Sequence, residues 1–307
     1  MKDRQIMGLI ATFVAVAEAG SFSRAAERVS RSPSAVTDHI NRLEALLEVR
    51  LLVRTTRSMR LTDAGEKFLA RGRRLLNDTN KLVTDFKDDN NAFMGRLVLA
   101  VSPTIAVSLM PKTLTTIAER QPGLMISLME ALRTEMLQLV ESGAVAFGIG
   151  PYDDVPDALV FRPIFGQEFR LILPEKHPIA ARGYARPDDL SGLDMMCPSV
   201  GSTARQVLDE LTRSAGFKVI PRYETLQYPT LFALVAAGLG ATVMPIVDPT
   251  LLSMSRLVAL PFEGRKIMRT MGVISRRGEV ETQASTLVIK TLLKTALINR
   301  NRLALIL

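Results

Sequence analysis

The chain has 307 residues, 47% of them apolar, which is enough to bury the cores of two or three modules and argues against intrinsic disorder. Its formal net charge of +8 favours a polyanionic partner or an anionic ligand, although modest basicity also serves solubility. The single cysteine, Cys197, excludes an internal disulfide and is typical of a reducing compartment. With only His39 and His177 beside it, a Cys/His metal cluster is excluded as well, and we interpret Cys197 and His177 as structural residues.

The first nineteen residues allow two interpretations. A basic start followed by the apolar run IMGLIATFVAVA is typical of a secretory signal peptide, which would make the chain a secreted solute-binding protein. The same apolar residues form a helical stripe that ends at Gly20, as in a buried helix. The residues that follow decide in favour of the helix, and no apolar run is long enough to span a membrane.

Three N-terminal helices are expected, over 1–19, 23–30 and 33–47, with a tight turn at 29–32. Ser32 followed by Pro33 is a start signal, because Ser accepts a free backbone N–H and Pro at the first helical position loses no hydrogen bond. This arrangement predicts a helix-turn-helix, whose second helix enters the major groove of DNA. Its apolar positions predict one buried face: Val36, Ile40, Leu43 and Leu47.

The opposite face of the third helix carries short hydrogen-bonding side chains where a solubilising helix would carry Lys and Glu. The side chains that we expect to face base edges are Ser34, Thr37, Asp38 and Asn41. Asp38 either accepts from a base amino group or pairs with Arg42 four residues on, and we favour the pair. The other DNA-binding candidates, for phosphates or the minor groove, are Arg31, Ser32, Pro33, Arg42, Arg54, Thr55 and Arg57.

Short strand-like runs at 49–53 and 59–61 predict a two-stranded wing after the helix-turn-helix. Between Arg50 and Arg74 there are eight Lys or Arg residues and two acidic residues, so positive charge is concentrated beside the third helix. A solvated surface is the alternative, but clustering of this kind is what phosphate neutralisation needs.

A long helix is expected to begin at Thr62 or Asp63 and to run to about residue 90. Its apolar residues Leu69, Leu76 and Val83 repeat every seven positions, which favours packing against another helix. We interpret this as a dimerisation helix; the alternative is a helix that packs on its own chain.

From residue 95 onwards strand and helix signals alternate, which is typical of an α/β fold with a parallel sheet. Strands are expected over 96–102, 124–130, 144–150, 169–174, 194–199, 222–225, 240–245 and 269–275. Helices are expected over 103–119, 133–142, 203–215, 229–237 and 285–297. The last strand and helix return the chain to the first sheet, which gives two lobes with a cleft.

Polar residues lie after three of these strands, at the point where each strand is followed by a helix. Helix N-termini offer free backbone N–H groups, and ligands of open parallel sheets bind at the carboxyl ends of strands. We therefore expect a small organic anion, of the carboxylate type, in the cleft. Its candidate contacts are Ser102, Thr104, Gly201, Ser202, Thr203 and Gln227. The alternative is that each hydroxyl only caps its own helix.

The N-terminal region resembles the DNA-binding domain of the LysR-type transcriptional regulators. The resemblance rests on Phe22-Ser23 after the Gly turn, Ala25-Ala26, SPSAV at the start of the third helix, Leu43-Glu44, Arg54-Thr55, and LT-AG from Leu61 to Gly65. The remainder is more loosely similar to the family's effector domain, through GRLVLAVSPT, LILPEKHPIA and LVAAGLGATVMP. Glu48 departs from the pattern, because it stands where the family commonly has Gly.

The resemblance implies a homo-oligomeric cytoplasmic regulator whose C-terminal domain has the type 2 periplasmic-binding fold. The fold class is then α/β with an N-terminal all-α winged helix-turn-helix and a long linker helix. The expected domains are a DNA-binding domain over 1–62, a linker/dimerisation helix over 63–92 and an effector domain over 93–307. Lobe I is expected over about 93–163 and 267–307, and lobe II over about 164–266.

The predicted function is sequence-specific regulation of a bacterial promoter, modulated by the effector between the lobes. Expected partners are a double-stranded promoter inverted repeat, the organic anion, further copies of the chain as dimer or tetramer, and RNA polymerase as a candidate; no membrane is expected. No phosphate-cradling Gly-rich loop or metal-ligand set is seen in the α/β region, so we predict no cofactor and no enzymatic activity.

Overall fold

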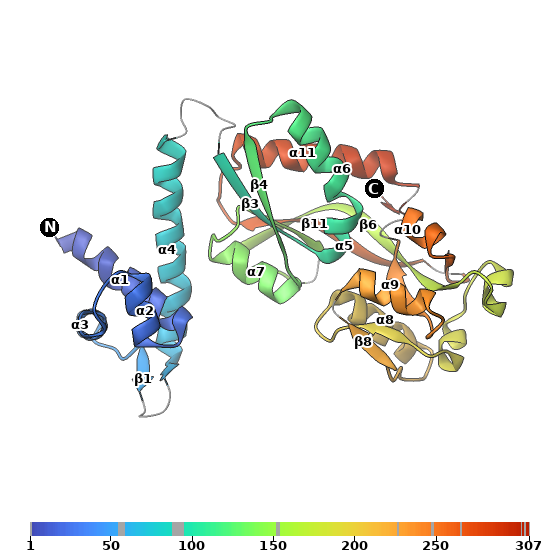
Figure 1. Ribbon diagram of the computed structural model, residues 1–307, viewed down its shortest axis with the longest axis horizontal. Helices are drawn as coiled ribbons and strands as arrows, with labels where there is room; N and C mark the ends of the chain where they lie inside the picture. The colour runs from blue at the N-terminus through green and yellow to red at the C-terminus, as the bar shows by residue number, and fades with distance from the viewer. Residues whose placement is uncertain are drawn as a thin grey trace. The chain divides into compact units, whose positions relative to one another are not determined.

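The computed structural model describes residues 2–54, 59–87, 95–151, 154–225, 227–246, 249–264, 266–301, 303 and 305–306. The chain forms two compact units (Figure 1). The N-terminal unit comprises Met1–Asn90 with Glu141–Ala144, and the C-terminal unit comprises Asn91–Val140 with Val145–Leu307. Within the described ranges no helix has the length and hydrophobicity needed to cross a membrane.

Three helices pack around one apolar cluster in the N-terminal unit: α1 (Lys2–Ala19), α2 (Phe22–Arg28) and α3 (Pro33–Leu47). Each begins and ends within two residues of its expected bounds. The apolar run of α1 lies in this cluster, where Phe13 and Val16 are fully buried. A two-stranded antiparallel wing follows, formed by β1 (Leu52–Arg54) and β2 (Met59–Leu61). The helix-turn-helix and the wing are therefore present as expected.

The buried face of α3 differs from expectation at one position. Val36, Ile40 and Leu43 are buried, but Leu47 is exposed, and the fourth buried side chain is that of Glu44. The Glu44 carboxylate accepts hydrogen bonds from the backbone N–H groups of Leu51 and Leu52, at 2.7 and 3.0 Å. The prediction for Leu47 was wrong because the helix ends there, and a carboxylate one turn earlier binds the returning chain.

The long helix α4 (Asp63–Lys87) is capped by Thr62, whose hydroxyl oxygen accepts from the N–H of Gly65 at 2.9 Å. Leu69 and Leu76 pack against the apolar cluster of α1 to α3. Gly72 lies close to α1, where an added Cβ would come within 3.2 Å of Ile10. The first two positions of the seven-residue repeat thus contact their own chain, and the side chain of Val83 lies outside the described residues.

The first lobe of the C-terminal unit is built on three parallel strands. In it, β3 (Gly95–Val101) lies between β4 (Leu124–Glu130) and β5 (Gly148–Pro151). Four helices belong to this lobe: α5 (Pro103–Ser108), α6 (Met110–Arg120), α7 (Arg133–Glu141) and α11 (Gln283–Asn299). The single helix expected over 103–119 is interrupted at Leu109, because Pro111 lacks the N–H that a continuous helix would use.

Two long antiparallel strands, β6 (Leu159–Pro174) and β11 (Ile267–Arg276), connect the lobes. The last residues of β6 pair with β9 (Thr242–Pro245) and β10 (Leu257–Leu260) of the second lobe. The C-terminal strand β12 (Leu305–Ile306) pairs with β6 at Gln167 and Gly166. This sheet is therefore mixed, and among its described strands the expected parallel pairing is that of β3 with β4 and β5.

The second lobe completes the C-terminal unit. A separate parallel pair, β7 (Met196–Pro198) and β8 (Tyr223–Thr225), packs with α8 (Thr203–Ser214) and α9 (Tyr228–Ala236). A short helix, α10 (Pro249–Met254), precedes β10. Two 3-10 helices cover Pro178–Arg182 and Pro187–Gly192. The unit thus has the two lobes that were expected, with β6 and β11 passing between them (Figure 1).

Candidate functional site

The start of α3 is built from hydroxyl side chains that cap the helix. The Ser32 hydroxyl accepts from the N–H of Ala35 at 3.2 Å and lies 3.0 Å from the Ser34 hydroxyl. The Thr37 hydroxyl donates to the carbonyl of Pro33 at 3.0 Å. Ser32, Pro33 and Ser34 are exposed, so this end of α3 remains accessible to a partner.

One turn further along α3, charge is balanced within the helix. Asp38 forms an ion pair with Arg42 at 3.4 Å, and both side chains are more than half exposed. The intrahelical pair that the sequence favoured is therefore present, and its contribution to stability is small because water screens it. Asn41 and Arg31 are exposed beside it. The backbone of Arg54 ends β1, whereas Thr55 and Arg57 lie outside the described residues.

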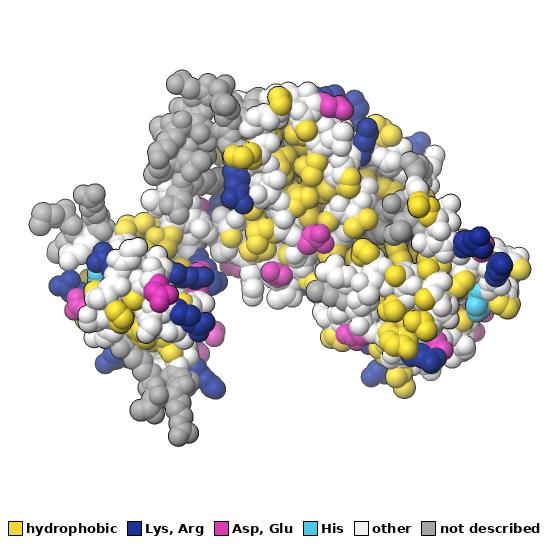
Figure 2. All heavy atoms as spheres, in the orientation of Figure 1, with side chains coloured by type: hydrophobic (Ala, Val, Ile, Leu, Met, Phe, Trp, Pro, Cys, Tyr) yellow, Lys and Arg dark blue, Asp and Glu magenta, His cyan; other side chains and the backbone are white. Residues whose placement is uncertain are grey.

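Basic residues surround this helix-turn-helix, and Lys and Arg side chains stand on the visible face of the N-terminal unit (Figure 2). Arg50, Arg73 and Arg74 pair with Glu44, Glu18 and Asp78. Other Lys and Arg residues between positions 50 and 74 are exposed and have no carboxylate partner among the described residues: Arg60, Lys67 and Arg71. Such unpaired cations are free to neutralise phosphates.

In the C-terminal unit, one buried arginine joins elements of both lobes. Arg269 of β11 is 8% exposed. Its guanidinium donates to the hydroxyl of Thr104 at 2.7 Å, to the hydroxyl of Thr203 at 2.8 Å and to Oε1 of Gln167 at 2.8 and 3.0 Å. Tyr228, the first residue of α9, also interacts electrostatically with this guanidinium. The starts of α5, α8 and α9 thus converge on this guanidinium.

Every partner of Arg269 among the described residues is neutral. Burial lowers the pKa of Arg269, and the nearby Tyr228 opposes that shift. The guanidinium also lies 5.3 Å from the ring centroid of Phe169, a favourable cation-π contact. A cavity of about 610 Å³ adjoins the cluster, and its described charged lining residues are Arg269, Lys266 and one acidic residue, Glu210 of α8. The site therefore holds an excess positive charge beside space for a ligand.

The six effector candidates divide into those that lie in this cluster and those that do not. Thr104 and Thr203 bind Arg269 directly, and the Ser102 hydroxyl lies 3.3 Å from that of Thr104. The Ser202 hydroxyl accepts from the N–H of Arg205 at 3.2 Å, so it caps α8, the alternative that the sequence had left open. Gly201, with φ +88°, and Gln227 are exposed at the starts of α8 and α9.

Sequence reasoning missed the residues at the centre of the cluster: Arg269, Gln167 and Tyr228. A signal was present for Arg269, which is the one charged residue in the strand sequence RTMGVIS. Gln167 had no such signal, because the first ten residues of β6 contain Pro163 and Gly166 and do not have a strand pattern.

Comparison with protein families assigns both units. Residues 7–66 match the model described as "Bacterial regulatory helix-turn-helix protein, lysR family", and residues 90–296 match the model described as "LysR substrate binding domain". The chain belongs to the LysR family. It is thus a LysR-type transcriptional regulator with an effector-binding domain, and nothing in these matches favours the secreted solute-binding protein. The family consists of transcriptional regulators rather than enzymes.

Similar proteins agree with this assignment to the LysR family. The chain is 32% identical over 238 residues to the uncharacterized HTH-type transcriptional regulator YfeR of Shigella flexneri, with 76% of each chain covered. A structure of full-length OxyR from Pseudomonas aeruginosa has a TM-score of 0.68 at 20% identity and covers 94% of this chain and 93% of its own. Full-length CbnR in complex with its target DNA has a TM-score of 0.66 at 21% identity, with 96% and 100% covered.

Proposed function

We propose that this regulator reads a promoter inverted repeat with α3 and that a small organic anion, bound at Arg269 between the lobes, modulates promoter activity. The proposal that the protein binds an anionic ligand rests on the Arg269 cluster. There, a buried cation has described partners that are all neutral. A buried guanidinium gains most from a charged acceptor, and its planar donor set matches a carboxylate.

The cluster also explains how a ligand would act on the lobes. We place lobe I over about 93–163 and 267–307, and lobe II over about 164–266, so Thr104 lies in lobe I and Thr203 in lobe II. One guanidinium donates to a hydroxyl from each lobe. An anion that competes for these N–H groups changes the link between α5 and α8, and ligand binding is then coupled to lobe arrangement.

On the DNA side, the exposed residues of α3 are proposed to specify sequence, and the unpaired cations beside them to bind phosphates. Ser34, Thr37 and Asn41 are the base-reading candidates, while Arg31 and Arg42 with the wing residues Arg54, Thr55 and Arg57 position the helix. We propose that α4 contributes to a dimer or tetramer that reads both halves of the repeat, and that RNA polymerase is contacted from this assembly. Neither enzymatic activity nor a cofactor is part of the proposal.

The experiment that tests the ligand half is a screen of small carboxylates against the full chain, read as an increase in unfolding temperature. Arg269→Met is the test variant, and Arg120→Met, which removes an exposed arginine of α6, is the matched control. A carboxylate that stabilises the native chain and Arg120→Met, but not Arg269→Met, supports the proposal. An unchanged response of Arg269→Met would show that the anion binds elsewhere.

The DNA half is tested by footprinting on the promoter region that flanks the gene, at two salt concentrations and with excess random DNA. We expect a protected inverted repeat whose affinity falls steeply with salt. Alanine variants of Ser34, Thr37 and Asn41 should lower the ratio of specific to random binding. An unchanged ratio would remove these residues from base recognition.

A further inference from the structure

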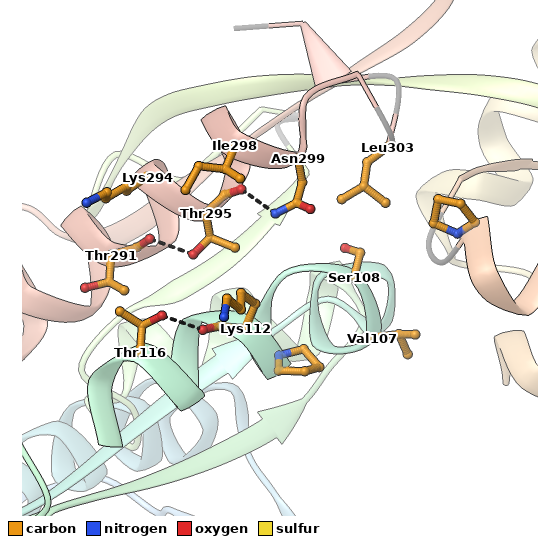
Figure 3. A pocket seen from close by; sticks show the side chains of 12 residues that line it. Val107, Ser108, Lys112, Thr116, Thr291, Lys294, Thr295, Ile298, Asn299 and Leu303 are labelled. Atoms are coloured by element: carbon orange, nitrogen blue, oxygen red, sulfur yellow. Dashed lines mark hydrogen bonds between the residues drawn. The ribbon is translucent and has the colours of Figure 1, made fainter. Parts of the chain in front are cut away.

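A second cavity, of about 600 Å³, lies between α6 and α11. Figure 3 shows the two helices facing each other across it, with side chains of both between them. Leu303, which precedes β12, and Pro249 of α10 also line it. Among the residues that the structure describes, this groove shares no lining residue with the cavity beside Arg269.

The groove has an unbalanced positive charge. Lys112 of α6 and Lys294 of α11 line it from opposite sides, and the lining residues that the structure describes include no Asp or Glu. In the described part of the chain neither lysine has a carboxylate partner, and α11 itself contains no acidic residue. Two ammonium groups over a concave wall attract an anion more strongly than the same charges on a convex surface.

The other polar groups of the groove act mainly as acceptors. The hydroxyl protons of Thr295, Thr116 and Ser108 are already donated to carbonyls of their own helices, at 2.9, 3.0 and 2.6 Å. Their oxygen lone pairs, and the Oδ1 of Asn299, remain as acceptors. The lining thus offers cationic donors together with neutral acceptors, and it fits an anion that carries hydroxyl groups.

We propose that this groove is a second ligand site, which takes a small polyhydroxylated anion of the class of sugar phosphates and sugar acids. The anionic group lies between Lys112 and Lys294, because lysine binds phosphate and carboxylate as a point charge. The ligand's hydroxyls donate to the threonine and asparagine oxygens. The exposed apolar side chain of Ile298 and that of Leu303 cover its carbon skeleton.

Two short connections link the groove to the Arg269 cluster. Ser108 lines the groove and donates to the carbonyl of Thr104, whose hydroxyl accepts from Arg269. Leu303 lines the groove two residues before Leu305, which pairs with Gln167, the other main acceptor of Arg269. An occupant that orders α5 and the C-terminal strand therefore acts on the acceptors of the buried guanidinium, so the second site regulates the first.

The test is calorimetric titration of the full chain with glucose 6-phosphate and with gluconate, and with glucose as the uncharged control. We expect one or both anions to bind with a Kd of roughly 0.1–1 mM, while glucose does not bind. The double variant Lys112→Met/Lys294→Met should weaken binding at least about tenfold, the loss of a charged contact. The relative affinity of the two anions identifies phosphate or carboxylate as the preferred group.

A matched control separates this site from general attraction by a basic protein. Lys290→Met/Lys218→Met removes the same two charges from exposed positions outside the groove and should bind as the native chain does. Arg269→Met should also retain binding, which keeps this result independent of the proposed carboxylate site. Absence of binding by both anions, equal loss in the two double variants, or loss in Arg269→Met would each overturn the proposal.

The coupling has its own readout in amide hydrogen exchange. Saturating glucose 6-phosphate or gluconate, whichever binds more tightly, should slow exchange along β12 and around Gln167 in the native chain but not in Lys112→Met/Lys294→Met. Unchanged exchange in the native chain would show that the groove does not regulate the Arg269 cluster.

Discussion

Thr104 and Thr203, at the starts of α5 and α8, bind the same guanidinium through hydroxyl oxygens 2.7 and 2.8 Å from Arg269. The two helices come from different lobes, so this shared donor is a direct polar link between them. Its strength is measurable, because Thr→Val keeps the shape of the side chain and removes the acceptor.

Each of Thr104→Val and Thr203→Val should lower the free energy of unfolding by about 1–2 kcal/mol, because a buried N–H of Arg269 loses its partner. Thr104 is fully buried, so its variant should cost more than that of the less buried Thr203. Urea denaturation of the two single variants and the double variant forms a cycle. Strict additivity would show that the two hydroxyls do not act through one group.

Because of Glu44, the free energy of unfolding of the N-terminal unit should depend on pH in the acid range. Burial alone would raise the pKa of Glu44, but the N–H groups of Leu52 and Leu51 and the Arg50 guanidinium lower that pKa overall. A carboxyl whose folded pKa is lowered contributes stability above its unfolded pKa, near 4.5, and loses it as pH falls through the folded value. Glu44→Gln should therefore destabilise the unit at neutral pH by about 1.5–3 kcal/mol.

The same variant should make the stability curve flatter below pH 4.5, and thermal unfolding between pH 3 and pH 7 measures both effects. Glu66→Gln, at an exposed position of α4, is the control and should leave the curve nearly unchanged. A Glu44→Gln protein with native acid sensitivity would show that this carboxylate carries no linked stability.

Glu48 ends α3 in the left-handed conformation, with φ +54°. A residue with a Cβ is destabilised by about 1 kcal/mol in this backbone conformation, whereas Gly is not. Glu48→Gly should therefore raise the stability of the N-terminal unit by roughly 0.5–1 kcal/mol, whereas the β-branched Glu48→Val should lower it. Differential scanning calorimetry of the three proteins measures the order, and a Gly variant less stable than the native chain would refute the strain.

Much of the fold was predictable because it depends on local rules. The bounds of α3 and β4 follow from a Ser-Pro start and from a bounded apolar run, and both matched. The first half of β6 and the strand β12 were not predictable, because only pairing with distant segments makes them strands. Likewise, the sequence placed Thr104 and Thr203 at helix starts, but the arginine that joins them comes from a strand more than sixty residues further on.

His39 links α1 to α3 and should make the unit sensitive to mild acid. The Thr12 hydroxyl donates to the carbonyl of Gly8, so the Nδ1–H of His39 donates to that hydroxyl at 2.8 Å. Burial, and next Arg31, lower the pKa of His39, while Asp38 opposes this and Arg42 adds to it. A histidine whose folded pKa is lowered stabilises the fold above its unfolded value of 6.5, and this contribution is lost as pH falls.

His39→Gln should remove that dependence between pH 7 and pH 5 while keeping a donor for Thr12. His177→Gln, in the other unit, provides the control. Nuclear magnetic resonance titration of the His39 ring gives the pKa directly, and a value at or above 6.5 would contradict the expected direction.

Cys197 should be chemically silent in the native chain. It lies in β7 with no exposed surface, and burial raises the pKa of its thiol to about 11, with Arg205 lowering it and Asp209 and Glu224 raising it. At pH 7 almost none of the thiol is ionised, and the thiolate is the reactive form. Iodoacetamide should therefore label the protein only as fast as it unfolds, and peroxide should leave DNA binding unchanged.

Substitution separates packing from chemistry at this position. Cys197→Ala leaves a small cavity and should cost about 1 kcal/mol, whereas Cys197→Ser buries a hydroxyl in an apolar layer and should cost more. DNA binding by the alanine variant should match the native chain with and without peroxide. Fast labelling in native buffer, or loss of DNA binding on oxidation that the alanine variant does not show, would make this thiol a sensor and would require an opening of the second lobe that exposes β7.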